Sequence, residues 1–221
     1  RLIASNVLEA ATEDIEYANG IFQVAGTDRS RTLYEIAAAG QDSQNLPEGE
    51  TPELIGSGEF GSNVASYANG CHLCEVEVDS ETGAVDIIDY TVVSDFGTVI
   101  NPLLTIGQVH GGVAQGVGQA LLEHCVYDDT SGQFLSGSFM DYTLPRASDF
   151  PFMDVTLAEG VPSLTNPMGI KGAGESGTVG APPALVNAVI DALAEFGVDN
   201  IDMPTLPEKI WKAINDSAQV S

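Results

Sequence analysis

A glycine-rich segment in the last quarter of the chain places one acid and one base among five glycines. Residues 169–180 read GIKGAGESGTVG, and Lys171 and Glu175 are the charged side chains. Glycine allows positive backbone angles and lets a ligand approach the main chain closely. Neither charged side chain has an evident structural task among such neighbours. We therefore predict an active-site or anion-binding loop over residues 160–181.

The glycine spacing of residues 172–177 matches the phosphate-binding loop of nucleotide hydrolases, but two required residues differ. Thr178 stands where that loop needs lysine, and Val179 stands where it needs serine or threonine. The charge that grips the terminal phosphates and the magnesium ligand are therefore both missing. A nucleotide-binding glycine loop is accordingly a weak alternative.

Gly172, Gly174 and Gly177 also fit the dinucleotide pattern G-x-G-x-x-G. That pattern needs a preceding strand and a helix that opens within the glycines, inside a βαβ unit. No such unit surrounds the loop, and Pro182 and Pro183 follow it. Proline is well tolerated in the first helical turn, so we predict a helix from these prolines to about residue 196.

A second glycine-rich segment, residues 103–124, has the pattern of a helix. Glycine inside a helix costs about 1 kcal/mol relative to alanine, so several together indicate a close approach to this backbone. The approaching group could be a ligand or another helix. A membrane dimer motif is excluded because polar residues interrupt the apolar face. The glycines are Gly107, Gly111, Gly112, Gly116 and Gly118, and the polar residues are Gln108, His110, Gln115 and Gln119.

Several motifs in one order resemble the C-terminal part of the molybdopterin-binding large subunit of the xanthine dehydrogenase and aldehyde oxidase family, the molybdenum hydroxylases. The loop 169–180 resembles the segment that presents the catalytic glutamate in that family. IGQVHGG at 106–112 with QGVGQA at 115–120 is similar to its pterin-contacting helix. Residues 71–78, 95–97 and 101–102 are similar to further segments. The resemblance covers most of residues 55–215, and residues 1–40 more loosely.

This resemblance implies a role for each site residue. Glu175 would be the general base that accepts a proton while a water-derived oxygen attacks an electron-poor carbon, and burial would raise its pKa toward neutrality. Gln108 would hydrogen-bond the cofactor. Lys171 would contact a cofactor phosphate or pair with a neighbouring acid. Gly111 and Gly112 would admit the pterin, and Gly172 and Gly174 would shape the loop.

The resemblance also implies cofactors and partners. The cofactor would be molybdopterin with molybdenum, in the cytosine dinucleotide form, and the substrate a purine, N-heterocycle or aldehyde. The upstream half of the large subunit, 2Fe–2S clusters and FAD would lie on partner domains or subunits, so this chain alone would be inactive. The alternative is a non-catalytic domain that acts only in assembly.

The composition limits which partners and which cellular location the protein can have. The 221 residues carry 7 Lys and Arg against 32 Asp and Glu, a formal net charge of -25, which makes nucleic-acid binding very unfavourable. Three cysteines fit a reducing compartment, so we expect a cytoplasmic protein. We find no signal peptide and no apolar stretch of about 18 residues, the length a membrane helix needs. The chain begins at Arg1, which is consistent with a piece of a longer protein.

The hydrophobic pattern predicts an α+β fold with antiparallel or mixed strands, a glycine-rich helix and C-terminal helices, as in the family's second cofactor-binding domain. We expect the whole chain, 1–221, to be part of one such domain. It would divide into a small segment at 1–40 with an Asn19-Gly20 hairpin, a loop at 41–61 and a main portion at 62–221. Strands are predicted at 71–78, 84–93 and within 126–157. Helices are predicted at 32–39 and after Pro207.

Weaker candidates have simple structural interpretations. A single C-x-x-C at Cys71 and Cys74 supplies two of the four ligands that zinc takes, so we predict buried strand thiols and no metal ligand. Core packing is predicted for the other candidates, although Phe134, Phe139 and Tyr142 could instead line a substrate channel. The other candidates are Cys125, His110, His124, Phe134, Phe139, Tyr142, Ile210, Trp211 and Ile214.

Overall fold

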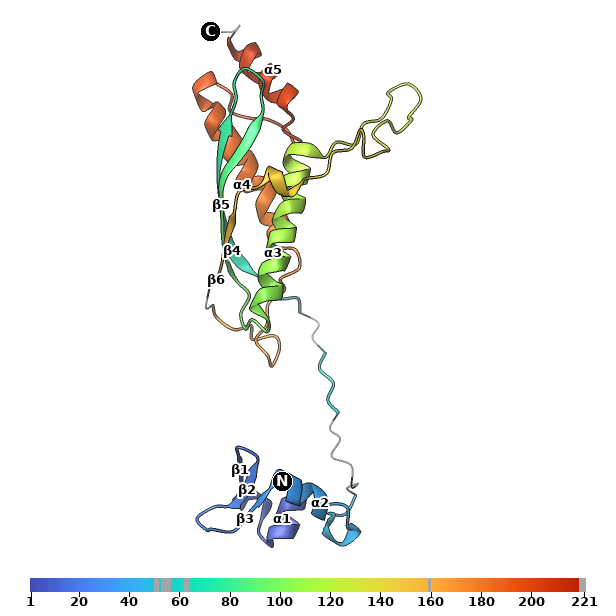
Figure 1. The fold of residues 1–221 in the computed structure, drawn as a ribbon, viewed down its shortest axis with the longest axis vertical. Coiled ribbons are helices and arrows are strands. Elements are labelled where there is room, and N and C mark those ends of the chain that lie inside the picture. The colour runs from blue at the N-terminus through green and yellow to red at the C-terminus, as the bar shows by residue number, and fades with distance from the viewer. Residues whose placement is uncertain (50–51, 53–56, 62–63, 159, 219–221) are drawn as a thin grey trace. The chain divides into compact units, whose positions relative to one another are not determined.

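The computed structural model describes residues 1–49, 52, 57–61, 64–158 and 160–218. It divides the chain into two compact units, Arg1–Phe60 and Gly61–Ser221 (Figure 1). Each unit has its own apolar core. Most of the predicted loop 41–61 belongs to the first unit, and several of its residues lie outside the described part of the chain.

The first unit packs helices against a small antiparallel sheet. It contains α1 (Leu2–Leu8), β1 (Ile15–Ala18), β2 (Ile21–Val24), β3 (Ser30–Thr32) and α2 (Leu33–Ala39), and the strand order is β1-β2-β3. The predicted hairpin is confirmed, because Asn19 and Gly20 connect β1 to β2 with φ angles of 50° and 80°. Thr32 and Glu35 form a capping box that starts α2.

The second unit is a three-stranded sheet covered by two long helices. Its strands are β4 (Asn69–Val78), β5 (Val85–Asp95) and β6 (Met153–Leu157). β4 pairs antiparallel with β5, as predicted, and β6 pairs parallel with β5. The helices are α3 (Pro102–Val117), continued by a π-helical turn at Gly118–Leu122, α4 (Ser176–Leu193) and α5 (Pro207–Ala218). Figure 1 shows α3 and α4 running along the sheet. The mixed sheet and helices confirm the α+β class.

Glycines allow α3 and α4 to touch at their backbones. A Cβ added to Gly112 would lie 2.9 Å from the Thr178 nitrogen, and one added to Gly177 would lie 2.5 Å from the Val109 carbonyl oxygen. A Cβ at Gly116 would lie 2.6 Å from that of Ala181. Tight helix packing therefore explains these three glycines, and it fixes the first turn of α4 against α3.

The predicted start of α4 was wrong. The helix begins at Ser176 rather than at Pro182, so the loop ends at Glu175 and both prolines lie inside the helix. Proline removes an amide donor from a helix interior. Here burial offsets that cost, because Pro182 and Ala181 are buried against α3.

The residues from Ser176 to Phe196 also correct the expectation of no membrane-length segment. Among the described residues they form the one helix that is long and apolar enough to cross a membrane. Leu185, Val189 and Leu193 of this helix are fully buried in the apolar cores of the unit. The core helix of a globular protein has the same length and composition, so this finding is weak evidence for a span.

Residues 123–146 form an arm that projects from the end of α3, in the region where the sequence predicts further strands (Figure 1). Its pairing is one isolated bridge between Tyr127 and Phe134, and only β6 joins the sheet. Polar contacts order the arm, including one between the Tyr142 hydroxyl and the Glu123 carboxylate, 2.5 Å apart. Strand-core packing was therefore wrong for Phe134 and Phe139, which are 37% and 81% exposed.

Candidate functional site

The loop that ends at Glu175 is held to the end of β5 and to the residues before β4. The Lys171 amide donates to the Phe96 carbonyl at 2.9 Å, and the Gly172 amide donates to the Ser66 carbonyl at 2.8 Å. A Cβ on Gly172 would lie 2.8 Å from that same Ser66 oxygen, so this position needs glycine. The predicted loop-shaping role of Gly172 thus has a specific contact.

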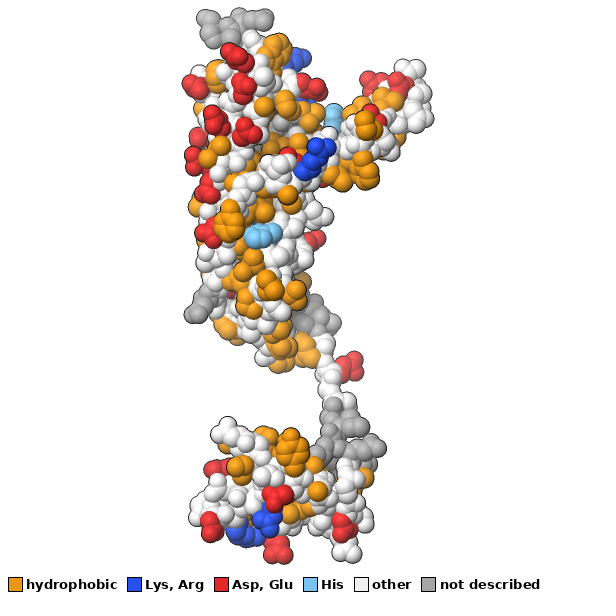
Figure 2. All heavy atoms as spheres, viewed as in Figure 1, with side chains coloured by type: hydrophobic (Ala, Val, Ile, Leu, Met, Phe, Trp, Pro, Cys, Tyr) orange, Lys and Arg blue, Asp and Glu red, His pale blue; other side chains and the backbone are white. Residues whose placement is uncertain are grey.

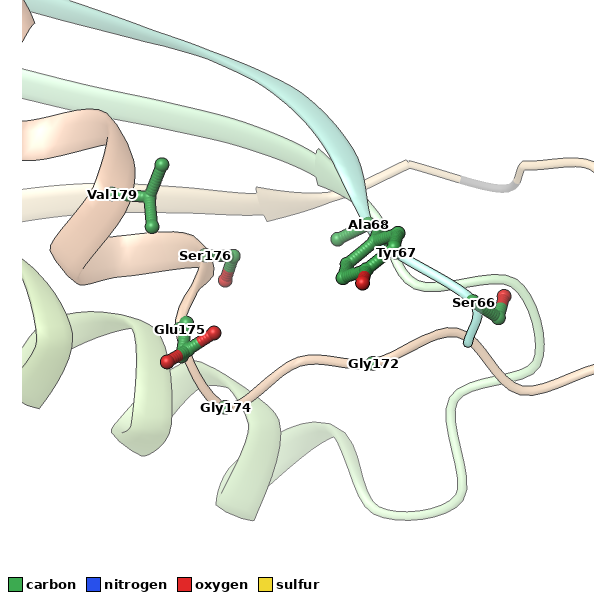
Figure 3. Close-up of a pocket in the computed structure, with 8 residues that line it drawn as sticks. All are labelled: Ser66, Tyr67, Ala68, Gly172, Gly174, Glu175, Ser176 and Val179. Atoms are coloured by element: carbon green, nitrogen blue, oxygen red, sulfur yellow. The ribbon is translucent and has the colours of Figure 1, made fainter. Parts of the chain in front are cut away.

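Glu175 lines a cavity of about 490 Å³ at the first turn of α4 (Figure 3). Tyr67 and Ala68 form the opposite side, and Ser176 and Val179 lie beside Glu175 on α4. Glu175 provides the one carboxylate among the lining residues. Its side chain is exposed, so the burial that we expected is not supplied by the described part of this chain.

Gln108 fixes the backbone immediately before Glu175. Its side-chain nitrogen donates to the Gly174 carbonyl at 2.8 Å, from the face of α3 that borders the loop. The amide retains a second hydrogen and an oxygen for another partner. Sequence reasoning assigned Gln108 to the cofactor and did not reveal this contact.

The predicted glycines on α3 separate into two groups. Gly112 packs against Gly177 and Thr178 of α4, so helix packing already accounts for it. Gly111 faces open space, since a Cβ there would meet no described atom within 4 Å, and the same holds for Gly174 in the loop. Of the pair assigned to the pterin, Gly111 is the position that a ligand can approach.

Gln115 was present in the family-like motif but was not selected as a site residue. It is exposed on α3, two turns from Gln108, and the Thr178 hydroxyl lies 3.4 Å from its side-chain oxygen. Two amides and the open Gly111 therefore lie along the same side of α3 as the start of α4. Helical spacing of seven residues could have indicated this shared face.

Lys171 pairs with an acid, one of the two roles that we considered. Its ammonium lies 2.6 Å from Asp95, at the end of β5, and both side chains are largely buried. The hydrogen bond from Lys171, followed by one from the Gly97 amide, holds the pKa of Asp95 below its ordinary value. The pair therefore clamps the glutamate loop to the sheet.

Lys171→Met should remove this clamp and raise the pKa of Asp95 toward its ordinary value of about 3.9. The lowered pKa stabilises the fold above that value, and this contribution is lost as pH falls through the folded pKa. We expect the variant to lose stability at neutral pH and to show a weaker dependence of stability on pH in the acid range. Carboxyl NMR titration and urea unfolding at several pH values would measure both effects. An unchanged Asp95 titration would contradict the clamp.

The cysteines do not form a metal site with the described residues. In the described ranges, no three His, Cys, Asp or Glu side chains are grouped closely enough to hold a metal ion. Cys71 and Cys125 are exposed, so our prediction that both are buried was wrong. Cys74 is half-buried, and burial raises the pKa of its thiol to about 11.

Of the three residues of α5 that were predicted to lie in the core, Ile210 and Ile214 are buried. The prediction was wrong for Trp211, because 47% of it is exposed.

His110 only partly fits its expected packing role. It is half-buried on α3, but its Nε2 atom is fully buried and has no hydrogen-bond partner among the described residues. His124 is half-buried, and its carbonyl accepts from the Ser136 hydroxyl at 2.8 Å.

Comparison with known proteins identifies the family. A molybdopterin cofactor-binding domain model matches residues 1–151. The chain is 39% identical over 211 residues, 96% of its length, to the 6-hydroxypseudooxynicotine dehydrogenase complex subunit gamma of Paenarthrobacter nicotinovorans. It is 34% identical over 98% of its length to the carbon monoxide dehydrogenase large chain of Hydrogenophaga pseudoflava. The chain spans about a quarter (26%) of the length of each of these relatives.

Solved structures show the same relationship. Quinoline 2-oxidoreductase from Pseudomonas putida 86 superimposes with a TM-score of 0.86 at 38% identity, over 97% of this chain and 27% of that one. The Cu,Mo-CO dehydrogenase superimposes with a TM-score of 0.87 at 33% identity, over 98% of this chain and 27% of that one. The chain therefore belongs to the molybdopterin-binding large-subunit family of the molybdenum hydroxylases, as the resemblance to xanthine dehydrogenase and aldehyde oxidase implied.

Proposed function

We propose that this chain is part of a molybdenum hydroxylase, in which it binds the molybdopterin cofactor and supplies Glu175 as general base. The position of Glu175 carries the proposal. It is the acid that lines the 490 Å³ cavity, and Gln108 and the Lys171–Asp95 pair hold its loop in place. Its backbone is thus anchored, and its carboxylate is exposed at the cavity.

The described residues fit the cofactor. Gln108 has hydrogen-bonding capacity left on its amide, and Gly111 leaves the α3 backbone open to a flat ligand. When bound, the cofactor supplies the molybdenum centre at which a water-derived oxygen is added to an electron-poor carbon. Glu175 would accept the proton that this step releases, and Gly172 and Gly174 would keep its loop close to the ligand. Lys171 acts through Asp95 and would hold the loop.

The exposure of Glu175 supports a role for companion polypeptide in completing the site. Exclusion of bulk water strengthens the electrostatic interactions in an active site, and this chain leaves the carboxylate open. The chain covers 26% of relatives that are named a complex subunit and a large chain. We propose that the upstream half of the large subunit closes the cavity, and that 2Fe–2S and FAD-bearing partners accept the electrons. The isolated chain would then be inactive.

The form of the pterin and the cellular location are proposed from the family resemblance. We propose the cytosine dinucleotide form of the pterin and a cytoplasmic location, which the three unpaired cysteines support. Among the substrate classes we favour an N-heterocycle over a purine or an aldehyde. Relatives named for 6-hydroxypseudooxynicotine and nicotine are 39% and 38% identical, against 31% for those named for an aldehyde and for hypoxanthine.

The competing proposal is a non-catalytic assembly module. Such a module has no need of a carboxylate in a cavity or of a side chain dedicated to its backbone, and both are present here. This observation favours the catalytic role.

Isotope labelling tests the reaction class. The native complex that contains this chain would be incubated with quinoline, an electron acceptor and H₂¹⁸O. We expect a hydroxylated product that carries ¹⁸O from water, and no label when only O₂ is labelled. Label from O₂, or absence of any hydroxylated product from quinoline, nicotine, hypoxanthine and benzaldehyde alike, would contradict the proposal.

A further inference from the structure

A second, smaller cavity adjoins the one that contains Glu175. It measures about 210 Å³ and shares three lining residues, Ala68, Ser176 and Val179, with the larger cavity. Its other walls come from the start of β4, the end of β5 and Gly180 of α4. A ligand in the larger cavity could therefore extend into the smaller one.

The smaller cavity has the hydroxyl of Ser94 in its wall. Ser94 is 2% exposed and lines this cavity, and no hydrogen bond between described residues uses its hydroxyl. A Cβ on Gly70 would lie 2.7 Å from the Ser94 Oγ, so glycine there keeps the space beside the hydroxyl free. The Ser94 hydroxyl therefore has hydrogen-bonding capacity that a ligand group in this cavity can use.

His72 supplies a second hydrogen-bonding group and no charge. Its Nδ1 atom lies 2.9 Å from the Tyr90 hydroxyl, which orients the ring. Burial lowers the pKa of His72, so the imidazole is neutral at pH 7. The ring edge packs against Gly180, where a Cβ would overlap the imidazole atoms. The Tyr90 contact and the packing against Gly180 thus fix the position of the His72 ring.

The two cavities share apolar walls, because Ala68 and Val179 line both, and they differ in their polar groups. The larger one contains the carboxylate of Glu175 and the side chain of Tyr67. The smaller one is lined by Asn69, His72, Ser94 and Ser176 as its polar residues, none of them charged. A charged ligand group would find no counter-charge there, whereas an uncharged donor or acceptor would find partners.

We propose that the smaller cavity is a substrate subsite for an uncharged hydrogen-bonding group, such as a ring carbonyl or hydroxyl, bound by Ser94 and His72. The apolar ring that carries this group would occupy the larger cavity, with its reacting carbon near Glu175. This assignment of substrate class rests on the proposed function. Gly180 is its size-determining residue, because any side chain there would displace His72.

Binding of two small probes by the full chain tests the subsite. 2-Pyridone carries a ring carbonyl, and toluene has a similar outline with a methyl group in place of the oxygen. Both would be titrated while the His72 and Ser94 resonances are followed by NMR. We expect 2-pyridone to shift these resonances and to bind more tightly than toluene. Ser94→Ala should weaken 2-pyridone binding by about three- to tenfold and leave toluene unchanged.

Two further variants sharpen the test. Ser80→Ala makes the same change on an exposed turn and should alter neither affinity. Gly180→Ala should abolish the preference for 2-pyridone by moving the His72 ring into the subsite. Equal weakening of both probes by Ser94→Ala, or 2-pyridone binding that leaves His72 and Ser94 unshifted, would overturn the proposal, as would no 2-pyridone binding up to its solubility limit. These experiments measure binding and not turnover. A negative result would therefore overturn the subsite without contradicting the proposed role of Glu175 as a base, which is tested separately by turnover.

Discussion

Glu175→Gln should reduce turnover of the assembled enzyme by about 10²- to 10⁴-fold, the usual contribution of a general base. Glutamine has nearly the same size and cannot accept the proton. Gln108 bonds to the carbonyl of Gly174 and not to the Glu175 side chain, so the loop should keep its position. Molybdenum content should therefore remain at the wild-type level. Steady-state kinetics with quinoline and elemental analysis of the same sample would measure both quantities.

The matched control is Glu195→Gln. Glu195 is an exposed acid in the short helical turn Ala194–Phe196, which follows α4, and it lines none of the described cavities around Glu175. This variant should keep wild-type turnover. Near wild-type turnover in Glu175→Gln would refute the base assignment. A loss of molybdenum together with turnover would show instead that Glu175 supports cofactor binding.

Gly177→Ala should destabilise the larger unit by about 3 kcal/mol or more, at the upper end of the usual cost of overpacking. The added Cβ would lie 2.5 Å from the Val109 oxygen and 2.8 Å from the Val113 nitrogen. These are backbone atoms of α3 and cannot rotate away, so the helices must separate. Urea unfolding should show a lower midpoint with an unchanged slope.

Gly107→Ala is the control for this prediction, because it makes the same change on α3 where no described atom lies within 4 Å of the new Cβ. Alanine favours helix by up to about 1 kcal/mol over glycine, so this variant should be neutral or more stable. Equal midpoints for the two variants would contradict the backbone contact between α3 and α4.

The elements with a strong local pattern could be predicted from the sequence. Asn19-Gly20 specifies the hairpin because both residues tolerate positive φ angles. β4 and β5 follow from the alternation around the turn at Gly83, where φ is 74°. The parallel pairing of β6 with β5 could not be predicted, because it joins segments separated by α3 and the arm.

The errors arose where tertiary contacts override local preference. Pro182 and Pro183 indicated a helix start, but glycine contacts with α3 extend α4 back to Ser176. Phe134 and Phe139 indicated strand core, but the arm does not pair with the sheet and is ordered by polar contacts instead. Apolar residue type alone does not determine burial in such a segment.

The candidate site also combines residues that a local sequence pattern indicates with contacts that depend on the tertiary fold. The glycine-rich composition predicted a functional loop that contains Glu175 and Lys171, and the role of Glu175 as a base came from the family resemblance and stays a prediction. The partners of the loop were hidden, because Gln108 is 66 residues from Gly174 and Asp95 is 76 residues from Lys171. Such pairs depend on how α3 and β5 meet the loop, which no local pattern encodes. The adjoining cavity was likewise not predicted, since Ser94 and His72 have ordinary strand patterns.

The most direct test of cofactor binding is the molybdenum and nucleotide content of this chain, purified natively with its companions. About one molybdenum per chain, together with a pterin and released cytidine nucleotide, is the result that we expect. A guanine or adenine nucleotide without molybdenum would contradict this account and favour a nucleotide-binding loop. A complex with neither metal nor pterin would leave the chain as an assembly module.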